Sequence, residues 1–223
     1  RMCRSAFPFY EQLNLKMPLV AYNGSFVKDI KQNKLLLHEN LLGTHACELI
    51  EIAHKEEVSI QVYVDDVLYT DRITPYVQAY LDTDKVEANV VTDLMPIARK
   101  GPTKIILLDK EQHLNRMWKV LAQKYAGQIY VTKSHPNLLE FVNIAANKGQ
   151  AVQFLAQLYG IEKDEMMACG DNYNDIPLLQ AAGLQVAMGN GVDAVKEVAN
   201  YVAPSNEENG VAQAIEKFVL NRK

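Results

Sequence analysis

The alternation of helix-length and strand-length segments after Gly149 constrains the fold of this chain most strongly. Helical periodicity over residues 151–158 leads into the short apolar run Met166–Cys169, which has the length of a buried strand. The pattern continues with helices expected at 174–182 and 192–198, strands at 184–188 and 201–202, and a last helix at 207–218. Short loops between alternating strands and helices are typical of a parallel sheet, because each crossover helix packs back onto the sheet.

The middle of the chain has a different pattern. Residues 59–69 alternate like a half-exposed strand pair that turns at Asp65-Asp66, and further strands are expected at 104–108 and 128–132 with a helix at 111–125 between them. Strand-rich, partly antiparallel material predicts an inserted α+β domain. Near the amino end we expect a helix at 9–13 and a strand at 19–22.

The fold class that follows is α/β: a doubly wound parallel, Rossmann-like core sheet with an inserted α+β domain. We divide the chain into a first part of the core at residues 1–35, the inserted domain at 36–137 and the second part of the core at 138–223. The connections are expected at the hairpin-like stretch 26–37 and at 134–147.

Composition and charge exclude several functional classes. The 223 residues carry a net charge of −4, so no basic field is available to hold a nucleic acid. The three cysteines are widely spaced and odd in number, which argues against a disulfide framework and predicts a reducing, cytoplasmic compartment. The five histidines show no zinc-ligand spacing. The apolar runs are too short to span a membrane, and the amino end does not read as a signal peptide.

The most informative short segment is Gly170–Asp175, which places two carboxylates and two amides after an expected buried strand. Open α/β sheets bind their ligands at the carboxyl ends of the strands, so this segment predicts a metal or phosphate site. The alternative is an ordinary helix N-cap, because Asp and Asn cap helices readily. A calcium loop is rejected, since Ile176 and Ala182 stand where such a loop needs Gly and Glu.

Two other segments are candidates for the same site. Lys148 lies at the start of an expected helix, where the macrodipole disfavours a cation, and this suggests an anion nearby. The alternative is a solvated surface lysine. Asn23-Gly24 follows a short apolar strand and fits a tight turn as well as a ligand contact.

Five motifs occur in a characteristic order along the chain. They are Tyr22-Asn23-Gly24, Leu139-Glu140-Phe141 before Asn147-Lys148-Gly149, Gly170–Asp175, Val186–Asn190 and Asn206–Val211. This ordered set resembles the haloacid dehalogenase-like hydrolases, specifically the Cof-type phosphatases with a C2B cap domain, and the resemblance covers essentially the whole chain. The inserted α+β domain would then be the cap domain over the active site.

The resemblance implies a Mg²⁺-dependent phosphatase that acts on small phosphorylated, sugar-phosphate-like metabolites. Asp171 is similar to the acidic Mg²⁺ ligand of the family, and Lys148 resembles the catalytic lysine that holds the phosphoryl group. Asp175 resembles the acid that positions this lysine or metal-bound water. The substrate-binding residues implied are Asn23, Gly24, Lys148 and Asn174. Substrate identity and oligomeric state do not follow from the motifs.

The sequence departs from the family pattern at its beginning. The family opens with an Asp-x-Asp motif that carries the nucleophile and the general acid, whereas this sequence starts at Arg1, which resembles the end of the family's second motif. We therefore expect the nucleophilic Asp to lie upstream of Arg1 and the 223-residue chain to be inactive alone. The alternatives are a non-catalytic metabolite-binding or regulatory relative and a sugar phosphomutase.

Overall fold

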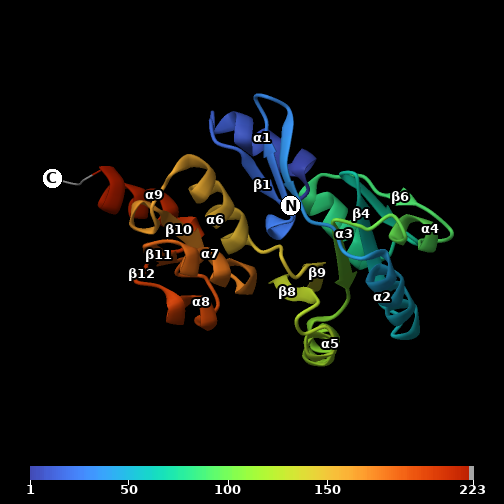
Figure 1. Ribbon diagram of the computed structural model, residues 1–223. Coiled ribbons are helices and arrows are strands. Elements are labelled where there is room, and N and C mark those ends of the chain that lie inside the picture. Colours follow the sequence, from blue (N-terminus) through green and yellow to red (C-terminus); the bar gives the residue numbers. More distant parts are fainter. Residues whose placement is uncertain (221–223) are drawn as a thin grey trace. The chain divides into compact units, whose positions relative to one another are not determined.

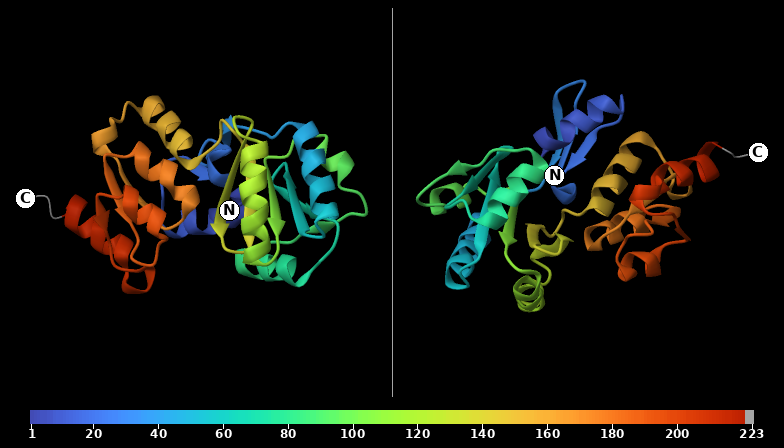
Figure 2. Two further views of the ribbon diagram at one scale, coloured as in Figure 1. Left: turned by 90° about the horizontal axis from the view of Figure 1, so that it is seen from below. Right: turned by 180° about the vertical axis from the view of Figure 1, so that it is seen from behind.

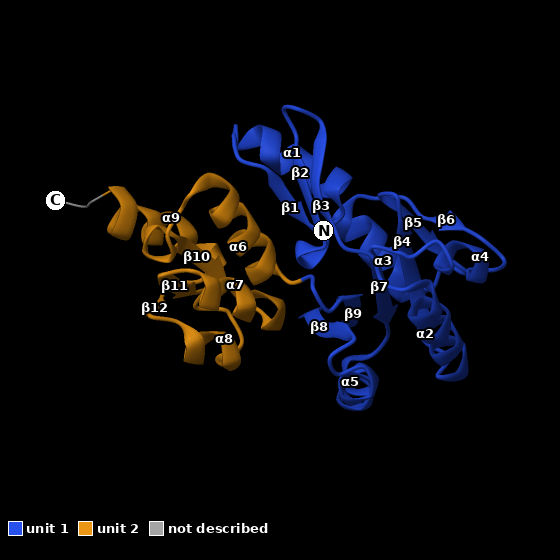
Figure 3. Ribbon diagram, in the orientation of Figure 1, with its two compact units in different colours: residues 1–146 blue, residues 147–223 orange. Residues whose placement is uncertain are grey.

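The computed structural model describes residues 1–220 and divides into two compact units, residues 1–146 and 147–223. Figure 1 shows the elements in chain order, and Figure 3 shows the two units in separate colours. No helix within residues 1–220 is both long enough and apolar enough to cross a bilayer. All three cysteines, Cys3, Cys47 and Cys169, are free thiols, as expected from their number and spacing.

The first unit contains two sheets. The smaller is antiparallel in the order β1-β2-β3, and the larger has six strands in the order β6-β5-β4-β7-β9-β8. The strands are β1 (Leu19–Ala21), β2 (Phe26–Asp29), β3 (Lys34–His38), β4 (Ser59–Val64), β5 (Val67–Thr70), β6 (Asn89–Val90), β7 (Lys104–Leu108), β8 (Ile129–His135) and β9 (Leu138–Asn143). The helices are α1 (Cys3–Gln12), α2 (Gly43–Lys55), α3 (Pro75–Asp84), α4 (Met95–Ala98) and α5 (Glu111–Lys124), with the 3-10 turn η1 at Tyr22–Gly24.

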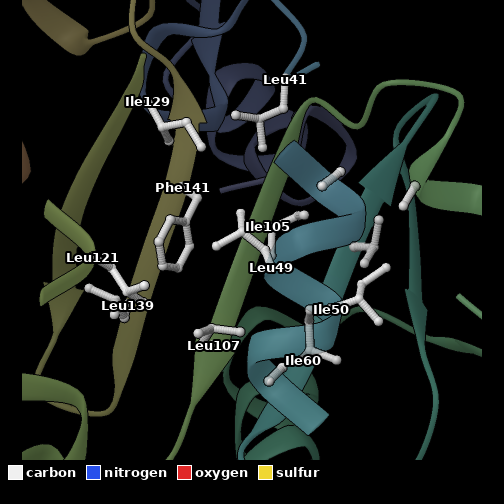
Figure 4. Close-up of a cluster of buried hydrophobic side chains, with 14 of the residues drawn as sticks. Leu41, Leu49, Ile50, Ile60, Ile105, Leu107, Leu121, Ile129, Leu139 and Phe141 are labelled. Carbon is white, nitrogen blue, oxygen red and sulfur yellow. The ribbon is translucent and has the colours of Figure 1, made fainter. Parts of the chain in front are cut away.

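The six-stranded sheet is buried on both faces because its strands alternate between two cores. Ile105 and Leu107 of β7 face α2, where they meet Leu49 and Ile50, and Phe141 of β9 joins the same cluster (Figure 4). Helix α5 also packs on β8 and β9, as the views in Figure 2 show. The alternate residues, such as Ile106, point to the opposite face, where they pack with α3, α1 and η1.

The second unit contains a small three-stranded parallel sheet with helices on both faces, in agreement with the predicted α/β class. Its strands are β10 (Met167–Gly170), β11 (Leu184–Ala187) and β12 (Tyr201–Val202), in that order and all parallel. The helices are α6 (Lys148–Tyr159), α7 (Ile176–Ala181), α8 (Asp193–Val198) and α9 (Gly210–Ile215), followed by a π-helical turn at Glu216–Leu220. The 3-10 turns are η2 (Lys163–Glu165), η3 (Tyr173–Asp175) and η4 (Asn206–Glu208). Apolar residues of α7 and α8 cover one face, and Ala214 of α9 packs on the other.

Most expected elements are present, and one is wrong. The strand pair at 59–69 is the hairpin β4-β5, which turns at Asp65-Asp66 with φ of 52° and 58°. The stretch 134–147, expected to be a connection, instead contains the end of β8 and all of β9, which pairs with both β7 and β8. The short turn after His135 closes a hairpin. The division into 1–35, 36–137 and 138–223 remains a prediction.

Candidate active site

The polar segment after β10 is a capping motif and a carboxylate cluster at once. Asn172 is the N-cap of η3, and Asp175 completes a capping box with it. The Asp175 Oδ2 atom accepts hydrogen bonds from the backbone N–H groups of Asp171, at 3.0 Å, and Asn172, at 3.1 Å. The capping interpretation is therefore correct for Asn172 and Asp175. It leaves the exposed Asp171 without a capping role at the carboxyl end of β10.

Lys148 lies beside this segment. It is the first residue of α6, whose N-cap Asn147 accepts a hydrogen bond from the Gln150 N–H at 2.9 Å. The Lys148 Nζ donates to the Asp175 Oδ1. The anion that the position of this lysine suggested is therefore Asp175, and the lysine is only partly exposed, at 31% of its side chain.

Two glycines permit this close approach. A Cβ on Gly149 would lie 2.2 Å from the carbonyl oxygen of Pro177, so α6 can pack against α7 only because this residue has no side chain. A Cβ on Gly170 would lie 2.4 Å from the Cβ of Asp175. Because neither glycine has a side chain, Lys148, the end of β10 and Asp175 can lie close together within the second unit.

The two carboxylates have different electrostatic environments. Burial alone would raise the pKa of Asp175, but the Lys148 ammonium and the two backbone N–H donors outweigh it and hold that pKa below its ordinary value. Burial and the repulsion from Asp175 raise the pKa of Asp171. Asp175 is thus a fixed anion, whereas Asp171 is a carboxylate that would gain from a nearby cation.

The donor set fits a Mg²⁺ ion that takes few ligands from this chain. Mg²⁺ commonly uses one or two carboxylates and completes its octahedron with water and substrate phosphate. Both oxygens of Asp175 are already engaged, so Asp171 is the carboxylate of this segment left for an ion. Within residues 1–220, no group of three or more His, Cys, Asp or Glu side chains forms a complete metal site. Asn174 is buried directly beside Asp175, with 5% of its surface exposed.

Asn23 and Gly24 belong to the first unit, in the turn η1 between β1 and β2. The register pairs Ala21 with Phe26, so four residues connect the strands and Asn-Gly is not the centre of a two-residue turn. The Asn23 side chain is buried, and its Nδ2 donates to the Glu140 Oε2 at 2.9 Å. The expectation that Asn23 and Asp171 line one cleft remains a prediction.

Glu140 and Lys104 form a buried ion pair that sequence reasoning missed. The Lys104 Nζ lies 2.9 Å from the Glu140 Oε2, and each side chain is only 3% exposed. Burial alone would raise the pKa of Glu140, but Lys104 and a hydrogen bond from Ser134 outweigh it and lower the pKa to about 2. The sequence showed only a single charged residue in each of two mostly apolar strands, which does not indicate that the two residues pair.

Comparison with known proteins identifies the family. The family model for haloacid dehalogenase-like hydrolases matches residues 1–215. The chain belongs to the haloacid dehalogenase-like hydrolases. The family expected from the motifs is therefore confirmed, and the α/β fold class agrees with solved members of it.

Three proteins of known sequence or structure show how similar this chain is to its relatives. Escherichia coli pyridoxal phosphate phosphatase YbhA is 30% identical over 96% of this chain and 81% of its own length. A crystal structure of a Thermotoga maritima protein is 31% identical, with a TM-score of 0.79, over 98% of this chain and 82% of that one. The structure of the subclass IIB sugar phosphatase BT4131 shares the fold, with a TM-score of 0.80 at 16% identity over 95% of this chain and 79% of that one. The relatives of this hydrolase thus include phosphatases.

Proposed function

We propose that this haloacid dehalogenase-like hydrolase is a Mg²⁺-dependent phosphatase of small phosphorylated metabolites that works through an aspartyl phosphate. The nucleophilic Asp would lie upstream of Arg1 in the complete gene product. The observation that carries the proposal is the Lys148–Asp175 pair beside Asp171 at the carboxyl end of β10. A fixed cation next to a carboxylate suited to a metal is the arrangement that phosphoryl transfer requires, since positioning and charge neutralisation supply most of the catalysis.

Each residue has a distinct proposed role. Lys148 would hold the phosphoryl oxygens with its ammonium, and Asp175 would fix the position of that ammonium through the hydrogen bond it accepts. Asp171 would hold Mg²⁺, which neutralises charge on the phosphate when bound. Asn174, Asn23 and Gly24 would contact the substrate.

The proposed substrate class is small phosphate monoesters, and two relatives with different substrates support such a broad class. The name of YbhA gives pyridoxal phosphate as its substrate, whereas BT4131 is described as a sugar phosphatase. One fold therefore serves leaving groups of different chemistry, as expected when the catalytic residues and the cap domain are separate parts. We propose sugar-phosphate-like metabolites in a reducing, cytoplasmic compartment, where the free thiols of this chain would remain reduced.

The test is phosphatase activity of the complete gene product with p-nitrophenyl phosphate, with and without Mg²⁺. Lys148→Met and Asp171→Asn should each reduce turnover at least about 100-fold, because each removes charge that stabilises the transition state. The matched controls are Lys163→Met and Asp193→Asn, which alter exposed side chains of the same unit and should retain activity. Undiminished turnover in Lys148→Met, or robust turnover by the 223-residue chain alone, would contradict the proposal.

A further inference from the structure

Glu140 is a buried acid that joins three separate segments of the first unit. It accepts hydrogen bonds from Asn23 in the η1 turn and from Lys104 of β7, each at 2.9 Å, and from Ser134 of β8. Glu140 itself belongs to β9, at the centre of these contacts. It therefore links the turn between β1 and β2 to the six-stranded sheet.

The chemistry of Glu140 fixes the orientation of the Asn23 amide. An ionised carboxylate only accepts hydrogen bonds, so the Nδ2 atom of Asn23 must face it and the Oδ1 atom must point elsewhere. The low pKa of Glu140 keeps the carboxylate ionised at neutral pH. Lys104 balances the charge, and its ammonium also lies 5.1 Å from the ring centre of Tyr63 and 5.9 Å from that of Tyr22.

The backbone of the η1 turn needs such support. Tyr22 and Asn23 are consecutive residues with φ of 51° and 56°, a left-handed conformation that is costly for a bulky residue such as tyrosine. The Tyr22 hydroxyl donates to the Asp66 Oδ1 at 2.6 Å, while the Asn23 amide is held by Glu140. Strained residues persist where their surroundings hold them, and here the side chains of both residues are anchored.

We propose that Glu140 is a positioning residue for the substrate site: it holds the Asn23 amide, and with it the η1 turn, in the conformation that meets the substrate. The effect on activity rests on the proposed function, in which Asn23 contacts the substrate. The structural effect does not, because it concerns contacts within the first unit alone. The six-stranded sheet would thereby set the geometry of a loop that belongs to the smaller sheet.

The test removes the carboxylate without leaving a charge buried. Replacing Glu140 alone would strand the Lys104 ammonium, so the variant is Glu140→Leu with Lys104→Met, which is free of charge and similar in volume. Asn23→Ala is made alone and in combination with that pair. Ser134→Ala is the matched control, since it removes another partner of Glu140 but leaves the Asn23 contact.

Two measurements read out the role. Hydrogen exchange in the 223-residue chain should become faster for the amides of residues 22–25 in the charge-free variant, with α2, which carries neither substitution, unchanged. In the complete gene product, the KM for p-nitrophenyl phosphate should rise between about 10- and 100-fold, because a displaced contact group costs that much, while kcat changes less. Adding the charge-free pair to Asn23→Ala should cause no further rise in KM.

The outcomes separate the two proposals. If the increases in KM multiply in the combined variant, or if hydrogen exchange at residues 22–25 is unchanged, Glu140 does not act through Asn23. Similar effects in Ser134→Ala would indicate a general structural role and would also overturn the inference. If the complete gene product has no phosphatase activity, the proposed function fails, and exchange at residues 22–25 still decides whether Glu140 holds the turn.

Discussion

Replacing Asp175 separates two contributions of a buried carboxylate, its charge and its acceptor capacity. The side chain is 7% exposed and accepts from Lys148 and from two backbone N–H groups. Asp175→Ala removes every acceptor but keeps the Cβ that lies against Gly170. Asp175→Asn keeps one oxygen that can accept from the backbone, and it replaces the other, charged oxygen with an NH2 group that cannot accept from Lys148. We expect the alanine variant to be the less stable of the two.

The magnitudes follow from the exposure of the partners. Each backbone N–H left without an acceptor in this partly buried segment costs about 1 kcal/mol, at the low end of the range for buried groups. The ion pair with Lys148, which is 31% exposed, adds only about 0.5 kcal/mol after allowance for solvent screening. Asp175→Ala should therefore lower the free energy of unfolding by about 2 to 3 kcal/mol, and Asp175→Asn by about 1 kcal/mol.

Urea unfolding of the 223-residue chain, followed by circular dichroism, measures both values. The pH dependence gives a second check. Because the pKa of Asp175 is lower in the folded state, its stabilisation is present above the ordinary aspartate pKa and is lost as the pH falls through the depressed value. The difference between the native chain and Asp175→Asn should shrink at acid pH. Equal destabilisation by Asn and Ala at neutral pH would show that charge, and not acceptor capacity, dominates, which would refute the reasoning.

Three further changes have expected results. Asp171→Asn should raise the free energy of unfolding by up to about 1 kcal/mol, because it relieves repulsion from the neighbouring carboxylate, and should abolish the heat of Mg²⁺ binding in isothermal titration of the complete gene product. Gly149→Ala should lower the free energy of unfolding, measured by thermal unfolding, by about 1 to 3 kcal/mol, since its Cβ would lie 2.2 Å from the Pro177 carbonyl oxygen. The stabilisation from Glu140 should be lost as the pH falls from the ordinary glutamate value toward about 2. In the variant with Glu140→Leu and Lys104→Met, the acid unfolding followed by near-ultraviolet circular dichroism should therefore depend less steeply on pH.

The elements that the sequence predicted well are those with regular periodicity. The alternation of strands and helices after Gly149 led to the correct parallel sheet, because each short apolar run has one natural role in such a pattern. Strand β9 lies within residues 134–147, which were expected to be a connection, whereas Pro136 and Asn137 form a tight turn between β8 and β9. Local turn residues do not distinguish a hairpin from a connection between domains. That distinction depends on which distant strand, here β7, offers hydrogen bonds.

The site was predictable where its residues are close in sequence or lie at special positions in elements. The position of Lys148 at a helix start predicted a nearby anion, and in the structure that anion is Asp175. The Lys104–Glu140 pair was not predictable, because the two residues are 36 positions apart and become neighbours only through the pairing of β7 with β9. Periodicity assigns each residue to a face of its own strand. It does not specify the register that brings Ile106 opposite Glu140 and leaves Lys104 within reach.

The two buried acids, Asp175 and Glu140, show how this chain fixes the orientation of neighbouring polar groups. Each acid pairs with one lysine and uses its remaining capacity to hold a segment of backbone or an amide near a turn. A buried ion pair with no net charge contributes little net stability, because the cost of desolvating its two charges offsets most of their attraction. Its value lies in geometry, since an ionised acceptor orients every donor around it. Lys148 also acts on Asp171, but burial and repulsion from Asp175 outweigh it and raise the pKa of Asp171. Within the described part of the second unit, Asp175 is therefore satisfied internally, whereas Asp171 is a carboxylate whose charge a bound cation would balance, which is consistent with the metal-dependent phosphatase proposed above.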